Sequence, residues 1–315
     1  MTDPNKEHFE PEQPPSNTTI REAYVEASSF LRGRGIMEPE SCAQQLAEHV
    51  LGLTRSELFL RFADIFPSEA TGAWREAVSR KGRGEPLQYI IGEQEFYGLP
   101  FTVNPAVLIP RPETELLVEA LIQHGRRMWP CAADNEGRGL QQPVLVDIGT
   151  GSGAIAVTIA SICTDWRVTA TDISPAALGV AQKNVERNGV GKRIDWLTGD
   201  LLQPVIAAGL APNILVSNPP YIPSRDIMEL QPEVRIHEPH LALDGGPDGL
   251  EPYRRIVMQM ADLPAYPALV GFEVGIHQAE AVTELLSNLR QWDWVETVPD
   301  LAGIARHVIA GRGFR

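Results

Sequence analysis

The chain has 315 residues, 43% of them apolar and 22% charged, which excludes collagen-like, disordered and coiled-coil proteins. Its 27 basic and 41 acidic residues give a net charge of −14, which disfavours a general nucleic-acid binder, because the phosphate backbone selects basic surfaces. No apolar run is long enough to predict a membrane span, and the proline-rich acidic start does not resemble a signal peptide. The cysteines Cys42, Cys131 and Cys163 lack metal-ligand spacing, so a reduced, cytoplasmic protein without a metal is expected.

The first part of the chain predicts a tail and then a small helical domain. Residues 1–18 contain four prolines and no apolar periodicity, which is typical of a disordered acidic tail. Residues 19–83 predict four helices, two of which begin at the capping-box sequences Thr19–Glu22 and Thr54–Glu57. The third helix is expected to continue as far as Ile65. No motif there indicates chemistry, so packing or substrate docking is the expected role.

A β-hairpin linker is expected between residues 84 and 107. Its two short strands, Tyr89–Gly92 and Glu95–Val103, are rich in aromatic and β-branched residues and are separated by glycine turns. A helix is predicted to follow, and then a polar loop at residues 130–142.

Strands and helices alternate after Val144, so residues 108–315 are predicted to form one α/β domain. Repeated βα units imply a mostly parallel sheet with helices on both faces. The predicted strands are Val144–Ile148, Arg167–Thr171, Ile194–Leu197, Ile214–Ser217, Ala268–Val274, Trp294–Val298 and Ala305–Ile309.

The first strand of this domain leads into a glycine-rich turn that opens a helix. Its spacing, Gly-x-Gly-x-Gly at Gly149, Gly151 and Gly153, is neither the dinucleotide fingerprint nor the phosphate-binding loop. Glycines allow a tight bend and the close approach of a ligand, and ligands bind at the carboxyl ends of strands in such sheets. A purely structural turn remains the alternative.

Acidic residues follow the second and third strands. Asp172, nineteen residues after Gly153, is placed to accept hydrogen bonds from both hydroxyls of a ribose. It could instead cap the next helix, although Ser174 already fills that role. Asp200 could face the exocyclic amine of an adenine, with Leu201 covering the ring, but a solvated turn explains Asp200 nearly as well.

The most specific motif is Asn218-Pro219-Pro220-Tyr221, which follows the fourth strand directly. A proline disfavours the helical conformation for the residue before it and offers no N–H, so this loop presents an excess of carbonyl acceptors. Together with the side-chain oxygen of Asn218 they can hold an –NH2 group by both hydrogens, while Tyr221 offers a flat surface for stacking. The alternative is a proline-rich turn without chemistry.

These motifs together resemble the class-I methyltransferases that use S-adenosylmethionine and methylate planar nitrogens. Within that fold, several sequence segments resemble those of the PrmC/HemK family of peptide chain release factor glutamine methyltransferases. The segments are Glu85–Gly92, Glu95–Gly98, Ile109–Glu115 and Glu238–Leu250, the last followed by Tyr253-Arg254. The similarity covers about residues 20–315.

The resemblance implies methyl transfer from S-adenosylmethionine, with S-adenosylhomocysteine as product, to the amide nitrogen of the glutamine in the Gly-Gly-Gln motif of release factors. Asn218 and the Pro219 carbonyl would accept the two amide hydrogens, and Pro220 and Tyr221 would enclose the amide plane. The implied cofactor-binding residues are Gly149, Thr150, Gly151, Ser152, Gly153, Asp172, Asp200, Leu201 and Asn218.

Three other functions stay open. A ribosomal-protein glutamine methyltransferase ranks second, because that family has a different phrase at the Arg-Pro-Glu-Thr position. An N6-adenine nucleic-acid methyltransferase would need a basic track, which four lysines and the acidic charge disfavour. A non-catalytic S-adenosylmethionine-binding protein has no need to grip an acceptor nitrogen. Neither stable nucleic-acid binding nor a membrane partner is therefore expected.

Overall fold

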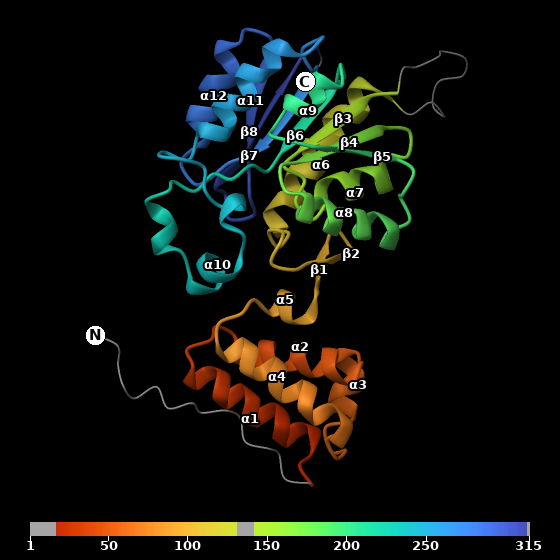
Figure 1. Cartoon of the computed structure of the whole chain (residues 1–315), viewed down its shortest axis with the longest axis vertical. Helices are drawn as coiled ribbons and strands as arrows, with labels where there is room; N and C mark the ends of the chain where they lie inside the picture. The colour runs from red at the N-terminus through yellow and green to blue at the C-terminus, as the bar shows by residue number, and fades with distance from the viewer. Residues whose placement is uncertain (1–16, 131–141, 314–315) are drawn as a thin grey trace. The chain divides into compact units, whose positions relative to one another are not determined.

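The structure is a computed structural model that describes residues 17–130 and 142–313 (Figure 1). Residues 1–16 of the predicted tail at 1–18, and most of the predicted loop at 130–142, lie outside the described residues. The chain divides into two compact units. The first extends to Gly92 and also includes Pro232–His237, and the second comprises Glu93–Gln231 and Glu238–Arg315. None of the helices within the described ranges has the length and apolar character needed to cross a membrane.

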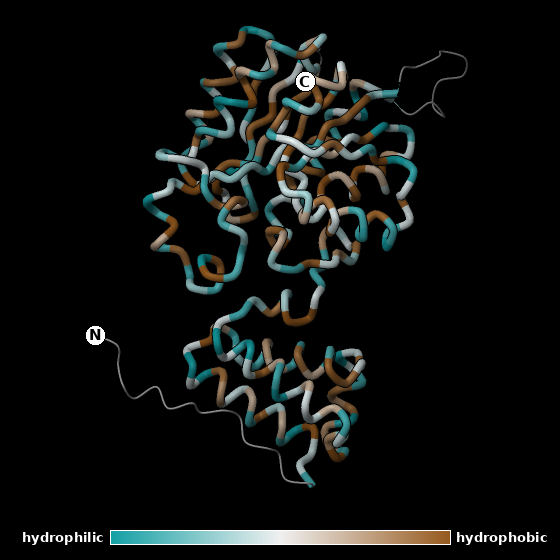
Figure 2. The backbone as a smooth tube through the Cα atoms, in the orientation of Figure 1, coloured by the Kyte–Doolittle hydropathy of each residue, from teal (hydrophilic) through white to brown (hydrophobic). Residues whose placement is uncertain are grey.

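The first unit is helical, as expected. Its helices are α1 (Ile20–Gly33), α2 (Pro39–Leu51), α3 (Arg55–Leu60), α4 (Thr71–Gly82), α5 (Leu87–Ile91) and α10 (Pro232–His237). Both predicted capping boxes are present, at Thr19 with Glu22 and at Thr54 with Glu57. Hydrophobic and hydrophilic colours alternate along these helices in Figure 2, and the apolar faces meet in a core that includes Leu31, Leu46, Leu58 and Trp74.

One helix in this unit is shorter than predicted. The helix α3 ends at Leu60, and Ile65 is exposed. The following segment supplies backbone carbonyls to the start of α1: the Ile20 N–H donates to Asp64 at 2.9 Å and the Arg21 N–H to Phe62 at 3.1 Å. The first amides of a helix have no partner inside it. Their demand for acceptors therefore competes with a longer α3.

The strand predicted at Tyr89–Gly92 is wrong, because this segment is part of α5 and the turn that ends it. Leu87 and Ile90 lie three positions apart and are both buried in the helical core. Gly92, at φ 82°, ends the helix in the left-handed conformation. Tertiary burial here overrides the strand preference of tyrosine and isoleucine.

The hairpin therefore starts later, at Glu93, and it belongs to the second unit. The single strand predicted at Glu95–Val103 is wrong, because the chain turns within that range. Strand β1 (Glu93–Phe96) pairs antiparallel with β2 (Leu99–Thr102) around the two-residue turn Tyr97-Gly98. Both turn residues have positive φ, as the favoured hairpin turn requires. Asn184 holds the hairpin by bonding both backbone groups of Thr102, at 2.7 and 2.9 Å.

The second unit is built on a seven-stranded sheet in the order β5-β4-β3-β6-β7-β9-β8, which confirms the predicted α/β class. The strands are β3 (Val144–Ile148), β4 (Arg167–Asp172), β5 (Ile194–Thr198), β6 (Ile214–Ser217), β7 (Leu269–Glu273), β8 (Trp294–Pro299) and β9 (Ala305–Gly311). Strands β3 to β7 run parallel, and β9 is antiparallel to both of its neighbours.

Helices cover both faces of this sheet, as predicted. One core packs α6 (Pro112–Met128), α7 (Ala154–Ile162) and α8 (Pro175–Arg187) on alternate strand residues such as Leu145. The other packs α9 (Gln203–Ala207), α11 (Glu251–Gln259) and α12 (Ala279–Asn288) on the intervening residues such as Val146. The hydrophobic colour in Figure 2 is strong along the central strands, which are buried on both sides.

This topology fixes where a ligand can bind. The chain leaves β3 for its neighbour β4 on one side, and later returns to β6 on the other side. Connections that diverge in this way leave a crevice at the carboxyl ends of the two central strands. The loops predicted to bind the cofactor and the Asn-Pro-Pro-Tyr motif leave the sheet at that edge.

Candidate active site

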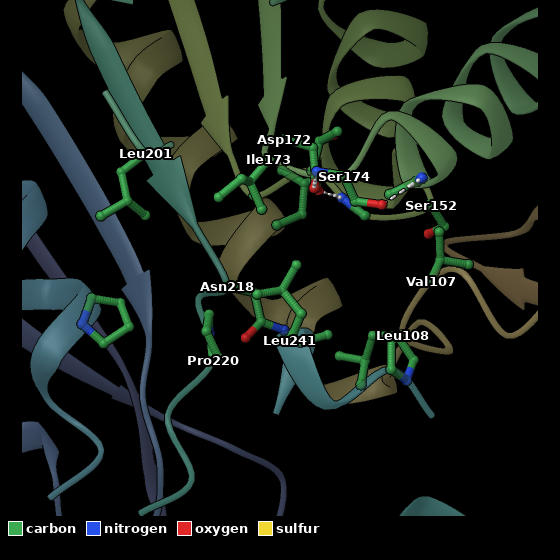
Figure 3. A pocket seen from close by; sticks show the side chains of 18 of the residues that line it. Val107, Leu108, Ser152, Asp172, Ile173, Ser174, Leu201, Asn218, Pro220 and Leu241 are labelled. Carbon is green, nitrogen blue, oxygen red and sulfur yellow. Dashed lines mark hydrogen bonds between the residues drawn. The ribbon is translucent and has the colours of Figure 1, made fainter. Parts of the chain in front are cut away.

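A cavity of about 440 Å³ lies at this crevice, within the second unit. That volume is in the range of small-molecule sites. Figure 3 shows Asp172 and Ser152 across the open space from Asn218 and Pro220. Among the predicted site residues, those that line the cavity are Gly149, Thr150, Gly151, Ser152, Asp172, Asp200, Leu201, Asn218 and Pro220.

The glycine loop after β3 is held by β4. The Gly149 and Thr150 amides both donate to the Thr171 carbonyl at 2.9 Å, and the Thr150 hydroxyl donates to Asp147 at 2.6 Å. Gly149 and Gly151 have positive φ, and no atom lies within 4 Å of the place where a Cβ would stand. The open space beside this backbone is where a cofactor could approach.

Gly153 has a packing role that the sequence did not predict. It precedes α7 at φ 81°, and a Cβ at this position would lie 3.1 Å from the Cβ of Ala181. Gly153 therefore allows the close packing of α7 on α8. It is not among the residues that line the cavity in the described chain, and its contact with a cofactor stays a prediction.

Asp172 ends β4 and faces the cavity with its carboxylate. One oxygen accepts from the Gly151 amide at 2.9 Å and the other from the Ser174 amide at 2.8 Å, while Ser174 caps α8 by accepting from Ala177. Burial raises the pKa of Asp172, although these amides oppose the shift. Each carboxylate oxygen keeps a lone pair for a further donor, so the residue can hold the loop and still accept from a ribose.

Asp200 and Leu201 lie at the end of β5. The Asp200 carboxylate pairs with Arg255 from α11, and both residues line the cavity. Sequence reasoning missed Arg255, because α11 itself was not predicted. Leu201 adopts φ 52°, a strained conformation for a side chain of this kind, and its carbonyl accepts from the Thr171 hydroxyl at 3.3 Å.

The Asn-Pro-Pro-Tyr motif turns its residues in different directions. Asn218 and Pro220 line the cavity, whereas Pro219 and Tyr221 are absent from the lining residues that the structure describes. The Tyr221 hydroxyl lies 3.4 Å from Glu273, and its backbone carbonyl accepts from Gln278 at 2.8 Å. The proposed stacking of a substrate on Tyr221 therefore stays a prediction.

The Asn218 side chain is oriented by a neighbour that sequence reasoning did not select. Its Nδ2 donates to the hydroxyl of Thr114 at 3.2 Å, and that hydroxyl donates to Glu273 at 2.5 Å. With Nδ2 engaged, Oδ1 remains as the acceptor. Thr114 lies in the segment Ile109–Glu115, which resembles the PrmC/HemK family. It is 104 residues from Asn218 along the chain, so the sequence did not predict their contact.

The segments Ile109–Glu115 and Glu238–Leu250 meet beside the cavity. The buried carboxylate of Glu238 pairs with Arg111 and accepts from the Ile109 amide at 3.3 Å. This joins the segment before α6 to the loop after the Asn-Pro-Pro-Tyr motif. The sequence alone indicated no role for either segment. Other residues that line the cavity were also not predicted: Val107, Leu108, Pro110, Ile173, Leu241 and Ala242.

The residues that line the cavity suit a nucleoside-like ligand. Within residues 17–130 and 142–313 no group of three or more histidine, cysteine or acidic residues is placed to hold a metal ion. The open glycine cradle and the inward carboxylate of Asp172 at neighbouring strand ends fit the nucleoside part of S-adenosylmethionine.

Each of the two units contains a segment that matches a known protein family. The PrmC N-terminal domain family matches residues 22–92, and the methyltransferase small domain family matches residues 133–234. A release factor glutamine methyltransferase of Moorella thermoacetica is 41% identical over 93% of this chain and 99% of its own length. The chain belongs to the release factor glutamine methyltransferase family. The family's enzyme of Bacillus subtilis is 39% identical over 93% of this chain and 97% of its own length.

Solved structures confirm the fold of this family member. The human METTL16 catalytic domain in complex with a MAT2A 3′UTR hairpin superposes with a TM-score of 0.52, covering 79% of this chain and 84% of that one at 17% identity. The N-terminal domain of human METTL16 in complex with SAH gives a TM-score of 0.50 at 18% identity, covering 75% and 84%. At such low identity the likeness extends to the class-I methyltransferase fold alone.

Proposed function

We propose that this protein transfers a methyl group from S-adenosylmethionine to the side-chain amide nitrogen of the glutamine in the Gly-Gly-Gln motif of peptide chain release factors. Membership of the release factor glutamine methyltransferase family supports this function. The observation in the structure that carries it is the orientation of Asn218. Its Nδ2 is bound to Thr114, which leaves Oδ1 as an acceptor in a cavity that also contains Asp172.

An amide nitrogen is a poor nucleophile because its lone pair is delocalised into the carbonyl. Asn218 Oδ1 and the Pro219 carbonyl are the proposed acceptors for its two hydrogens. Accepting both favours the charge that develops on the nitrogen and orients its lone pair. Pro220 lines the cavity and can pack against the amide plane.

S-adenosylmethionine supplies a methyl group that is already strongly electrophilic, so no covalent enzyme intermediate is needed. The glycine loop at Gly149–Gly151, with Asp172, is proposed to bind its nucleoside. Asp200 is engaged by Arg255 and retains one oxygen for an adenine amine, beside Leu201.

Residues 19–83 are proposed to dock the protein substrate, because a single glutamine amide is too small to specify one protein. Three large apolar side chains within seven residues, Phe59, Leu60 and Ile65, are exposed there. Leu60→Glu should raise KM for intact release factor about tenfold while leaving S-adenosylmethionine affinity unchanged. Leu301→Glu, at a residue of the second unit that is similarly exposed, is the matched control. An unchanged KM for Leu60→Glu would argue against docking on this part of the unit.

The function is tested by incubating the protein with methyl-labelled S-adenosylmethionine and one of three acceptors. Intact release factor should acquire label, while release factor with its Gly-Gly-Gln glutamine changed to alanine and adenine-containing duplex DNA should not. Label on the alanine variant or on DNA, or no label on release factor, contradicts the proposal. The net charge of −14 is the specific reason to expect no transfer to nucleic acid.

A further inference from the structure

The carboxylate of Glu273, at the end of β7, joins two residues of the candidate active site that come from different segments. Its Oε2 lies 2.5 Å from the Thr114 hydroxyl, and its Oε1 lies 3.4 Å from the Tyr221 hydroxyl. Glu273 is only 2% exposed and is not among the residues that line the cavity in the described chain. A buried carboxylate is costly unless it is hydrogen-bonded, and Thr114 and Tyr221 supply such bonds here.

The direction of the hydrogen bonds follows from the number of hydrogens. An ionised carboxylate can only accept, so the single hydrogen of the Thr114 hydroxyl is directed at Glu273. The Thr114 oxygen is then left with lone pairs alone, and Asn218 can meet it only with Nδ2, at 3.2 Å. The charge on Glu273 thus determines which end of the Asn218 amide faces Thr114 and which faces the cavity.

We propose that Glu273 is a positioning residue for methyl transfer: through Thr114 it holds Asn218 with Oδ1 toward the substrate amide, and it anchors the Tyr221 hydroxyl at the same time. This inference rests on the function proposed above. Neither Glu273 nor Thr114 donates to or accepts from the reacting atoms; they act by fixing the rotamer of the residue that does.

Protonation of Glu273 allows the opposite direction of hydrogen bonding along Glu273, Thr114 and Asn218. A carboxylic acid can donate to Thr114, whose own hydrogen is then free to turn toward Asn218 and bind Oδ1. The amide flips, and it presents Nδ2 to a substrate –NH2 group that needs an acceptor. Methyl transfer should therefore be slower when Glu273 is protonated.

The surroundings place this proton transfer near neutral pH. Burial raises the pKa of Glu273 to about 7; the Thr114 bond and the charge of Arg306 on β9 oppose that shift, and the charge of Glu113 on α6 adds to it. From α11, the Tyr253 hydroxyl bonds the Glu273 backbone carbonyl at 2.6 Å. His307 on β9 is its register partner, and burial lowers the pKa of that imidazole.

The first test is Glu273→Gln. The neutral amide can either donate to Thr114 or accept from it, so it no longer dictates the orientation of Asn218. The single-turnover rate should fall on the order of tenfold or more, with S-adenosylmethionine affinity unchanged, because misorientation of a reacting group affects chemistry rather than cofactor binding. The wild-type rate should fall below about pH 7, and the variant should lose this acidic limb. Glu296→Gln is the matched control. It removes a carboxylate of β8, a strand of the same sheet, that pairs with His124 of α6, and it should keep both the rate and the pH profile.

The second test uses Thr114, and its first comparison does not depend on whether Glu273→Gln folds. Thr114→Ser keeps the hydroxyl and should retain most of the rate, whereas Thr114→Val keeps the shape, removes the hydroxyl, and should lower the rate on the order of tenfold or more. The double variant should be no slower than either single variant, because both act through one chain of hydrogen bonds.

Equal rates for Glu273→Gln and wild type, equal rates for the serine and valine variants, or additive losses would overturn the proposal. Failure of the proposed function is distinguishable, because in that case the wild-type protein itself leaves release factor unlabelled.

Discussion

The capping carboxylates of the helical unit and the buried carboxylates beside the cavity lie in opposite environments. In the helical unit, Glu22 and Glu57 are exposed, and hydrogen bonds from the backbone and hydroxyls of Thr19 and Thr54 lower their pKa values. In the methyltransferase unit, three carboxylates beside the cavity are buried, and burial raises the pKa values of Asp147, Asp172 and Glu273.

This difference separates residues that stabilise the fold from residues that prepare a site. A capping carboxylate is stabilised by being charged, so it adds to the stability of its helix. A buried carboxylate with a raised pKa is destabilised when charged, and such groups cluster at functional sites because function requires them there. Substitution of a capping carboxylate should therefore lower the stability of its helix, whereas substitution of a buried carboxylate should change binding, chemistry or the pH dependence of stability.

The largest effect is expected at Asn218. Asn218→Ala removes the proposed acceptor and should lower the single-turnover methyl-transfer rate by about 10²-fold or more, comparable to losing an oxyanion-hole donor. Asn218→Asp keeps the shape but adds negative charge near the cationic sulfonium, so cofactor binding should be kept or tightened while the rate falls. Asn288→Ala, at an exposed amide of α12, is the control. Wild-type rates in both Asn218 variants would mean that Asn218 is only a turn residue.

The next effect is expected at Asp172. Asp172→Ala should weaken S-adenosylmethionine binding by about 2–3 kcal/mol, the scale of hydrogen bonds to a charged group. Calorimetry on the folded variant measures it. Asp195→Ala removes the same charge from an exposed position on β5 and should leave the affinity unchanged. If the two variants bind equally well, Asp172 serves only to hold the loop and the start of α8.

The sequence predicted local and repeated features well, and it missed those that depend on distant contacts. Both capping boxes and the parallel sheet follow from patterns within short segments. The helix at Leu87–Ile91 was missed because its residues prefer strands until a core buries them. The contact of Asn218 with Thr114 joins positions 104 residues apart, so no local pattern could reveal it.

A third effect concerns Asp147, whose pKa burial raises to about 7 while hydrogen bonds from Thr150 and Ala156 oppose the shift. Because the folded value lies above the unfolded one, the folded protein binds more protons between them, and stability falls as pH rises through that range. Asp147→Asn removes this dependence. Relative to the variant, the wild-type protein should lose about 2 kcal/mol of unfolding free energy between pH 5 and pH 7. Denaturant titrations at the two pH values measure the unfolding free energies of both proteins. If the difference between wild type and variant is the same at pH 5 and pH 7, Asp147 does not titrate in this range.

The smallest effect is expected in the helical unit, where it should have the opposite pH dependence. Thr54→Ala removes the side-chain cap of α3 and should destabilise the unit by about 1 kcal/mol without changing S-adenosylmethionine affinity. Thr54→Ser keeps the hydroxyl and is the control. The folded pKa of Glu57 is lowered by the bonds from Thr54, so its contribution is present above the unfolded value of 4.5 and is lost as pH falls through the folded value. Hydrogen exchange of α3 should therefore show a difference between alanine and serine variants that is full at pH 7 and shrinks toward pH 3, whereas the Asp147 effect grows as pH rises. A cap effect that is independent of pH would mean that Glu57 takes no part in it, and that the contrast between the two units lies in burial alone.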